Sequence, residues 1–185
     1  MGTQRAKSQP RKMKPVFLVL CEGETEETYL EYLRRTYRSP IKIVPKITGD
    51  SICQKLVAKK IQEVKLSPNE VIKAFLMYDR DVESINAKID ACKGVFLLSN
   101  PCVELWFLLH NKPIASSVST DSCIASLKKI GGVWSNYEKP IITETQKANL
   151  TSTVKAAIKN AKMFTLYDNP SSSIYILIEE IMRSI

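Results

Sequence analysis

Two apolar runs that end abruptly in carboxylates constrain the fold of this chain more than any other feature. Residues 16–21 lead directly into Glu22, and residues 74–78 lead into Asp79-Arg80-Asp81. An unbroken apolar run of about four to eight residues is typical of a strand buried on both faces, as in a parallel sheet covered by helices. Ligands bind beyond the carboxyl ends of strands in open α/β sheets. We therefore expect the two acidic tips to meet at one site.

Strand and helix patterns alternate through about residue 110, which is typical of a parallel α/β sheet. The apolar runs predict strands at 16–21, 41–44, 71–78 and 95–98. Helical periodicity predicts helices at 24–38, 51–65, 82–92 and from residue 103 to about 109. Asp50 or Ser51 is the expected cap of helix 51–65. These patterns predict an α/β fold with a parallel sheet of about four strands and flanking helices.

The rest of the chain has a different character. Helices are predicted at 120–130 and 144–163, and Asn169-Pro170-Ser171 is expected to cap a last helix. Residues 1–14 are basic and contain no acidic residue, which is typical of a disordered arm. We therefore divide the chain into an arm (1–14), an α/β core (15–110) and a helical extension packed on that core (111–185).

Charge points to a polyanionic partner. The net charge is +8 and the pI about 9.2, and a basic surface attracts nucleic acid first. A basic soluble protein that binds no polyanion would show the same balance. The residues expected to hold nucleic-acid phosphates are Arg34, Arg35, Lys59, Lys60, Lys155 and Lys159.

Cysteine usage and hydropathy favour the cytoplasm. The five cysteines are odd in number and never spaced CxxC, which argues against a disulfide framework or a zinc site. No apolar stretch reaches the roughly 18 residues needed to cross a bilayer, and no secretory signal pattern is visible.

The pair Asp79 and Asp81 is the strongest candidate for metal binding. On extended backbone their side chains point to one side, about 7 Å apart at the alpha carbons. Two carboxylates repel by roughly 1 kcal/mol at 4 Å in water and about 4 kcal/mol in a partly buried site. Mg²⁺ removes that repulsion, and it also takes phosphate oxygens as ligands. Glu22 would add a third carboxylate, and Glu26 is spaced to face the same region. The alternative is that these acids are helix caps and surface ion pairs.

Gly23, between Glu22 and the helix, is expected to allow a tight turn and the approach of a phosphate to the backbone.

Two further polar residues lie in the apolar run 103–110. Glu104 is an acid in a buried helix and needs a partner, for which Arg80 or a metal ion is suitable. His110, the only histidine, is placed to bond carbonyls at the helix end. Its unperturbed pKa of about 6.5 also suits a base or a proton shuttle. We treat Glu26, Arg80, Glu104 and His110 as residues that support the metal site.

Several motifs, taken in order, resemble the RloB family. They are LCEGETE at 20–26 followed by Tyr29, DRD at 79–81, SNPCVELWFLLH at 99–110 and NPSS at 169–172. This prokaryotic family has a Toprim-like domain and is often encoded near restriction or other phage-defence genes. The resemblance runs from about residue 15 to 183, with its most specific part at 99–110. Val103 stands where members commonly have phenylalanine.

The resemblance implies roles for three residues. The Toprim pattern places a glutamate after the first strand and Asp-x-Asp after the third, and Glu22, Asp79 and Asp81 match it. In catalytic Toprim proteins these carboxylates bind Mg²⁺, and the glutamate takes part in acid–base steps.

The sequence supports three hypotheses about function. The first is a nuclease or related phosphodiester enzyme that depends on Mg²⁺ or Mn²⁺ and acts on DNA or RNA in phage defence. The second is a non-catalytic subunit that binds nucleic acid or a nucleotide signal. It would work with an ATPase partner, because this chain has no GxxxxGK[ST] motif of its own. The third is an α/β domain whose acids are structural.

Overall fold

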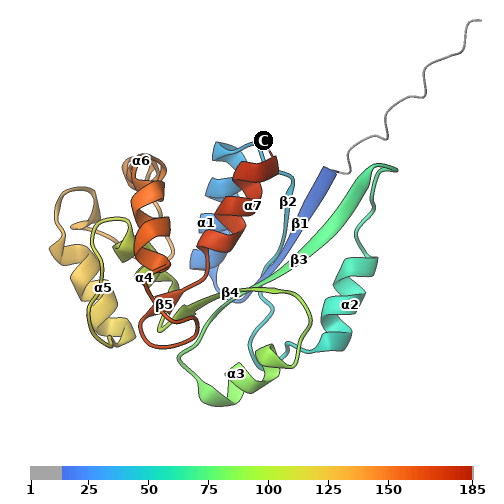
Figure 1. The fold of residues 1–185 in the computed structure, drawn as a ribbon, viewed down its shortest axis with the longest axis horizontal. Helices are drawn as coiled ribbons and strands as arrows, with labels where there is room; N and C mark the ends of the chain where they lie inside the picture. The colour runs from blue at the N-terminus through green and yellow to red at the C-terminus, as the bar shows by residue number, and fades with distance from the viewer. Residues whose placement is uncertain (1–13, 185) are drawn as a thin grey trace, which may run out of the picture.

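A five-stranded sheet in the order β2-β1-β3-β4-β5 organises the computed structural model, which describes residues 14–184 (Figure 1). The parallel strands are β1 (Lys14–Cys21), β2 (Ile41–Val44), β3 (Glu70–Asp79) and β4 (Val95–Asn100). The short strand β5 (Ser171–Ser172) pairs antiparallel with β4. The α/β prediction is confirmed, with one strand more than expected. Residues 1–13 of the predicted arm lie outside the described residues, and Lys14 begins β1.

Seven α-helices surround this sheet in the described residues. They are α1 (Glu24–Thr36), α2 (Gln54–Gln62), α3 (Glu83–Asp90), α4 (Val103–Leu109), α5 (Thr120–Lys129), α6 (Glu144–Ala161) and α7 (Tyr175–Ser184). A 3₁₀ turn, η1 (Gly132–Trp134), follows α5. Between residues 14 and 184, no helix combines the length and apolar character that a membrane span requires.

The predicted cap of α2 is wrong. The N-cap is Cys53, whose side chain makes no capping hydrogen bond. Asp50 instead binds Lys88 at 2.8 Å, and the Ser51 hydroxyl lies 2.8 Å from the Thr48 hydroxyl. Both candidate caps are therefore used in the turn before the helix.

The predicted cap of the last helix is also wrong. Ser171 and Ser172 lie opposite Asn100 and Ser99 as strand β5, and the Ser172 and Ser99 hydroxyls are 3.0 Å apart. Ser173 Oγ accepts a hydrogen bond from the Leu98 amide at 2.7 Å. These contacts attach the residues before α7 to the edge of the sheet.

Alternation along the strands separates two apolar layers. Phe17, Val19 and Cys21 of β1 pack in one cluster with residues of α1, α4, α6 and α7. Leu18 and Leu20 pack in the other, toward α2 and α3. Figure 1 shows α1 and α7 lying together along one side of the sheet, away from α2 and α3. The helical extension shares its core with the sheet, and the boundary drawn at residue 110 stays a prediction.

Candidate carboxylate site

The carboxyl ends of β1 and β3 lie next to each other, which brings the predicted acids to one edge of the sheet. Cys21 pairs in register with Met77, and both belong to the cluster under α1 and α4. Because side chains alternate along a strand, Asp79 points to that same face. Glu22 follows Cys21, so continued alternation directs its side chain to the opposite face.

The contacts of Glu22 agree with that direction. Its Oε1 accepts a hydrogen bond from the Gly49 amide at 3.0 Å, in the segment between β2 and α2. Its charge also contributes, after burial, to the raised pKa of Tyr78, which packs in the cluster toward α2 and α3. A Cβ atom on Gly49 would lie 2.2 Å from Cγ2 of Ile85, so only glycine allows this approach of the backbone.

Asp79 lies among a different set of carboxyl groups. Burial raises its pKa well above the ordinary value, and the charges of Glu26 and Glu104 raise it further. Lys139 opposes this rise, and Asp81 makes a smaller contribution than the two glutamates. Glu26 on α1 and Glu104 on α4 are 6% and 0% exposed. The charges of Glu26 and Glu104 therefore affect the pKa of Asp79 more than the charge of Asp81 does.

Glu104 is held by two residues that sequence reasoning did not single out. Its Oε1 accepts a hydrogen bond from the Tyr137 hydroxyl at 2.8 Å. Lys139 Nζ forms an ion pair with the other carboxylate oxygen, Oε2, at 3.0 Å. Burial lowers the pKa of Lys139, but Glu104, Cys102 and Asp79 together raise it, and the net shift is upward.

Gly23 gives space to Glu26. A Cβ atom at Gly23 would lie 2.4 Å from Glu26 Oε2. The Gly23 backbone has φ −99° and ψ 165°, which any residue can adopt, so the expected tight turn is not the reason for glycine here. Burial raises the pKa of Glu26, and the charges of Glu104 and Glu22 add to this effect. The side chain expected to support the site is therefore one of its central carboxyl groups.

The donor chemistry of this edge fits a hard divalent cation, because carboxylate oxygens are the ligands of Mg²⁺ and Mn²⁺. The ion pair between Glu104 Oε2 and the Lys139 ammonium shows that this edge holds one positive charge. Over residues 14–184, however, no three His, Cys, Asp or Glu side chains lie close enough together to hold a metal ion as they stand. The ligand set Glu22, Asp79 and Asp81 stays a prediction.

Arg80, between the two aspartates, anchors the chain where β3 ends. It forms a two-point ion pair with Asp90, with contacts of 2.8 and 3.3 Å, and its guanidinium lies 5.1 Å from the centre of the Tyr167 ring. The expected pairing of Arg80 with Glu104 is therefore replaced by the Lys139 contact. Asp81 is exposed.

His110 is a buried neutral residue rather than a site base. Its Nδ1 lies 2.9 Å from Oγ1 of Thr153, which itself donates to the Asn149 carbonyl. Nδ1 therefore carries the proton, and Nε2 is left without a hydrogen-bond partner among the described atoms. Burial lowers the pKa of His110 to about 3.

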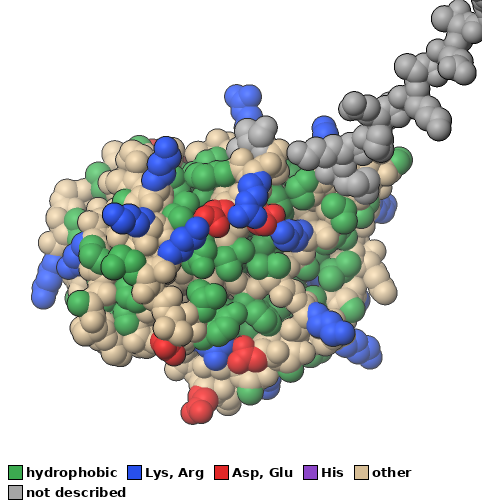
Figure 2. Space-filling model, in the orientation of Figure 1, with side chains coloured by type: hydrophobic (Ala, Val, Ile, Leu, Met, Phe, Trp, Pro, Cys, Tyr) green, Lys and Arg blue, Asp and Glu red, His purple; other side chains and the backbone are tan. Residues whose placement is uncertain are grey.

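The basic residues predicted to hold phosphates divide between the two layers. Arg34 binds Glu31 at 2.6 Å on α1, whereas Lys60 binds Glu63 at 2.8 Å on α2, across the sheet. Arg35 lies on α1 and Lys59 on α2, and Lys155 and Lys159 are exposed on α6. Figure 2 shows basic side chains interleaved with acidic ones on the face that carries α7. Ion pairs join that helix to its surroundings, including Lys73 with Glu180 at 2.7 Å.

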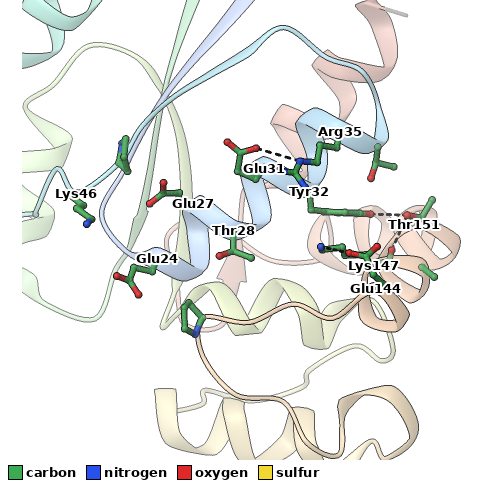
Figure 3. Close-up of a pocket in the computed structure, with 14 residues that line it drawn as sticks. Glu24, Glu27, Thr28, Glu31, Tyr32, Arg35, Lys46, Glu144, Lys147 and Thr151 are labelled. Carbon is green, nitrogen blue, oxygen red and sulfur yellow. Dashed lines mark hydrogen bonds and ion pairs between the residues drawn. The ribbon is translucent and has the colours of Figure 1, made fainter.

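A groove of about 920 Å³ opens beside the acidic edge, between α1 and α6 (Figure 3). Glu24 and Glu27 line it near the start of α1, and Pro140, the neighbour of Lys139, lines it as well. In Figure 3 the Tyr32 ring extends from α1 toward Thr151 of α6, with a hydroxyl distance of 2.9 Å. The remaining polar lining residues are Thr28, Glu31, Arg35, Thr36, Lys46, Glu144 and Lys147.

Comparison with known proteins places the chain in a family. No match was found among curated proteins or among solved structures. The family model described as RloB-like protein matches residues 17–181, which is most of the 185-residue chain. The chain belongs to the RloB-like protein family.

Proposed function

We propose that this protein is a nuclease or related phosphodiester enzyme that depends on Mg²⁺ or Mn²⁺ and acts on DNA or RNA in phage defence. The observation that carries the proposal is the position and environment of Asp79. It ends a central strand at the edge where α/β sheets bind ligands, and burial and neighbouring carboxylates raise its pKa. A nearby cation would favour the charged form of a carboxyl group whose pKa is raised in this way.

The protein's own residues have distinct tasks in this proposal. Glu22, Asp79 and Asp81 are the carboxylates implied by the family resemblance to hold the cation. A bound divalent ion would supply positive charge against the phosphate that reacts. Arg80 positions the two aspartates through Asp90. The groove beside the site offers Arg35, Lys46 and Lys147 as contacts for flanking phosphates.

The test is cleavage of DNA and RNA by the purified protein with Mg²⁺ or Mn²⁺. The double variant Asp79→Asn, Asp81→Asn should lose cleavage of either nucleic acid. The matched control is Asp121→Asn, Asp168→Asn, which changes two exposed aspartates elsewhere and should keep full activity. Full activity in the first double variant would refute the proposal.

A non-catalytic subunit is the second candidate, and two observations favour it. Glu22 turns toward Gly49, and the described carboxylates form no ready cluster of three for a metal. The protein would then bind nucleic acid or a nucleotide signal and work with an ATPase partner. Binding that is indifferent to Mg²⁺ and to the Asp79 and Asp81 changes, without turnover, would support this candidate.

A further inference from the structure

We infer that Tyr167 is a positioning residue for the candidate site. Its ring holds the guanidinium of Arg80 and thereby fixes the two aspartates that flank Arg80 in the chain. The inference rests on the proposed function, because it concerns the same Asp79 and Asp81. It assigns a role to the segment between α6 and β5, which Figure 1 shows beside the end of β4.

Arg80 is held at three points. Its backbone amide donates to the Ser99 carbonyl at 2.8 Å, which continues the pairing of β3 with β4 one residue beyond Asp79. The edge of its guanidinium binds the Asp90 carboxylate, at 2.8 and 3.3 Å. Its Cζ lies over the Tyr167 ring, 5.1 Å from the ring centre, which is within the range of a cation–π contact. The Arg80 side chain is only 15% exposed, so water competes little with these contacts.

The end of β4 contacts both Arg80 and Tyr167. The Tyr167 carbonyl accepts a hydrogen bond from Asn100 Nδ2 at 2.9 Å. Asn100 directly follows Ser99, whose carbonyl binds the Arg80 amide. Tyr167 is therefore bonded to the same strand end as Arg80 while its ring lies against the Arg80 side chain. This arrangement leaves the ring and the guanidinium little freedom to move apart.

The backbone of Tyr167 indicates that the surrounding contacts impose its conformation. Its φ is 76°, in the left-handed region that glycine adopts far more readily than an aromatic residue. Strained residues of this kind cluster at functional sites, where the surrounding structure holds them. Tyr167 is also 40% exposed, so burial in the core does not explain a tyrosine at this position. The contact with Arg80 does explain it, because a cation–π contact requires an aromatic ring.

The position of Arg80 determines where both aspartates point. One peptide bond joins it to Asp79 and the next joins it to Asp81, so a rotation at Arg80 turns both carboxylates. Asp81 is exposed and lies beyond the last residue of β3, so its direction depends on the residue before it. Loss of the Tyr167 ring should therefore loosen the aspartate pair and leave the groove between α1 and α6 as it is.

Native-state hydrogen exchange, followed by NMR, tests the inference without substrate or metal. In Tyr167→Gly the ring is removed, and the φ of 76° suits the new residue, so the variant should fold. The Arg80 amide should exchange about tenfold faster than in the wild type, because the cation–π contact no longer opposes local opening. Tyr167→Phe keeps an aromatic ring and should exchange at the wild-type rate. Unchanged exchange of the Arg80 amide in Tyr167→Gly would overturn the inference.

Cleavage kinetics with Mg²⁺ or Mn²⁺ separate positioning from substrate binding. Tyr167→Gly should lower kcat about tenfold and leave the KM for nucleic acid unchanged, whereas Tyr167→Phe should keep the wild-type kcat. An unchanged kcat, or a raised KM that shows direct contact with the substrate, would overturn the inference. If the wild type cleaved neither DNA nor RNA, the proposed enzyme would fail, and hydrogen exchange would still decide whether Tyr167 holds Arg80.

Tyr175→Leu is the matched control. Lys162 Nζ lies 5.4 Å from the centre of the Tyr175 ring, so this variant removes a contact of the same kind at the start of α7. It should leave both the exchange of the Arg80 amide and kcat at wild-type values. Faster exchange of that amide in Tyr175→Leu would show that the effect is not specific to Tyr167 and would overturn the inference.

Discussion

The imidazole of His110 should make this protein sensitive to acid through a single titrating group. In the folded state it is 3% exposed and its pKa is lowered by burial to about 3. In the unfolded chain it takes up a proton near a pH of about 6.5. A lowered pKa means that the folded state holds the neutral form. The stability that the neutral imidazole contributes is therefore fully present above about pH 6.5. It is lost as the pH falls toward about 3.

The size of the effect follows from the two pKa values. At a pH of about 4.5, two units below the unfolded value, the unfolded state gains about 1.4 kcal/mol per unit, or about 2.7 kcal/mol in total. His110→Asn removes the titration but keeps an amide that can donate to Thr153 Oγ1. The variant should lose packing stability at every pH, yet lack this extra loss in acid.

Urea unfolding at about pH 7.5 and about pH 4.5 measures the difference between the two proteins. Comparing their changes with pH cancels the other titrating groups, which both share. Thr153→Val serves as a control, because it removes the hydrogen-bond partner but leaves the imidazole buried, and it should keep the acid sensitivity of the wild type. If wild type and His110→Asn lost the same stability on acidification, the reasoning would be refuted.

Three further predictions follow from the site and the core. Gly23→Ala should weaken Mn²⁺ binding in calorimetry without unfolding the protein, since the new Cβ displaces the Glu26 carboxylate while the backbone angles suit alanine; unchanged affinity would contradict it. Tyr29→Phe leaves the buried Trp106 indole N–H without its hydrogen-bond acceptor at 2.7 Å. The variant should lower the free energy of unfolding in urea by about 1–3 kcal/mol, and an unchanged value would show that this hydrogen bond does not stabilise the fold. In EDTA, a raised pKa for Asp79 means that the contribution of this carboxyl group to stability declines as the pH rises above about 4. Asp79→Asn should therefore gain stability relative to wild type as the pH rises from about 4, and a constant difference would count against the raised pKa.

The strands and helices of the fold were predictable because their signals are long and local. The runs ending at Cys21 and Asp79 are unbroken and apolar, and they form the two central strands. Strand β5 carried no such signal, because two serines have no periodicity and become a strand only by pairing with Ser99 and Asn100 of β4. The wrong cap of the last helix has the same origin, and Asp50 before α2 likewise pairs with the distant Lys88, whereas Ser51 contacts the neighbouring Thr48.

The candidate site was predictable as an edge of the sheet but not as a set of ligands. The sequence places Glu22 and Asp79 after neighbouring strands, but which face each side chain takes depends on the register of Cys21 with Met77. Glu26 could be suspected from its spacing, and Glu104 from its place in an apolar run. Lys139 lies in a connecting segment without periodicity, and nothing local connects it to an acid 35 positions earlier in the chain.

Strand β5 lies near the end of the chain, which has a consequence for folding during synthesis. Ser99 and its hydrogen-bonding partner Ser172 are separated by 73 residues, so a growing chain has laid down four parallel strands long before the outer side of β4 is covered. During that interval the bare backbone of β4 is a template to which another nascent chain can attach. Slow translation between residues 100 and 171 should therefore favour aggregates, and chaperones that shield exposed strand edges should suppress them.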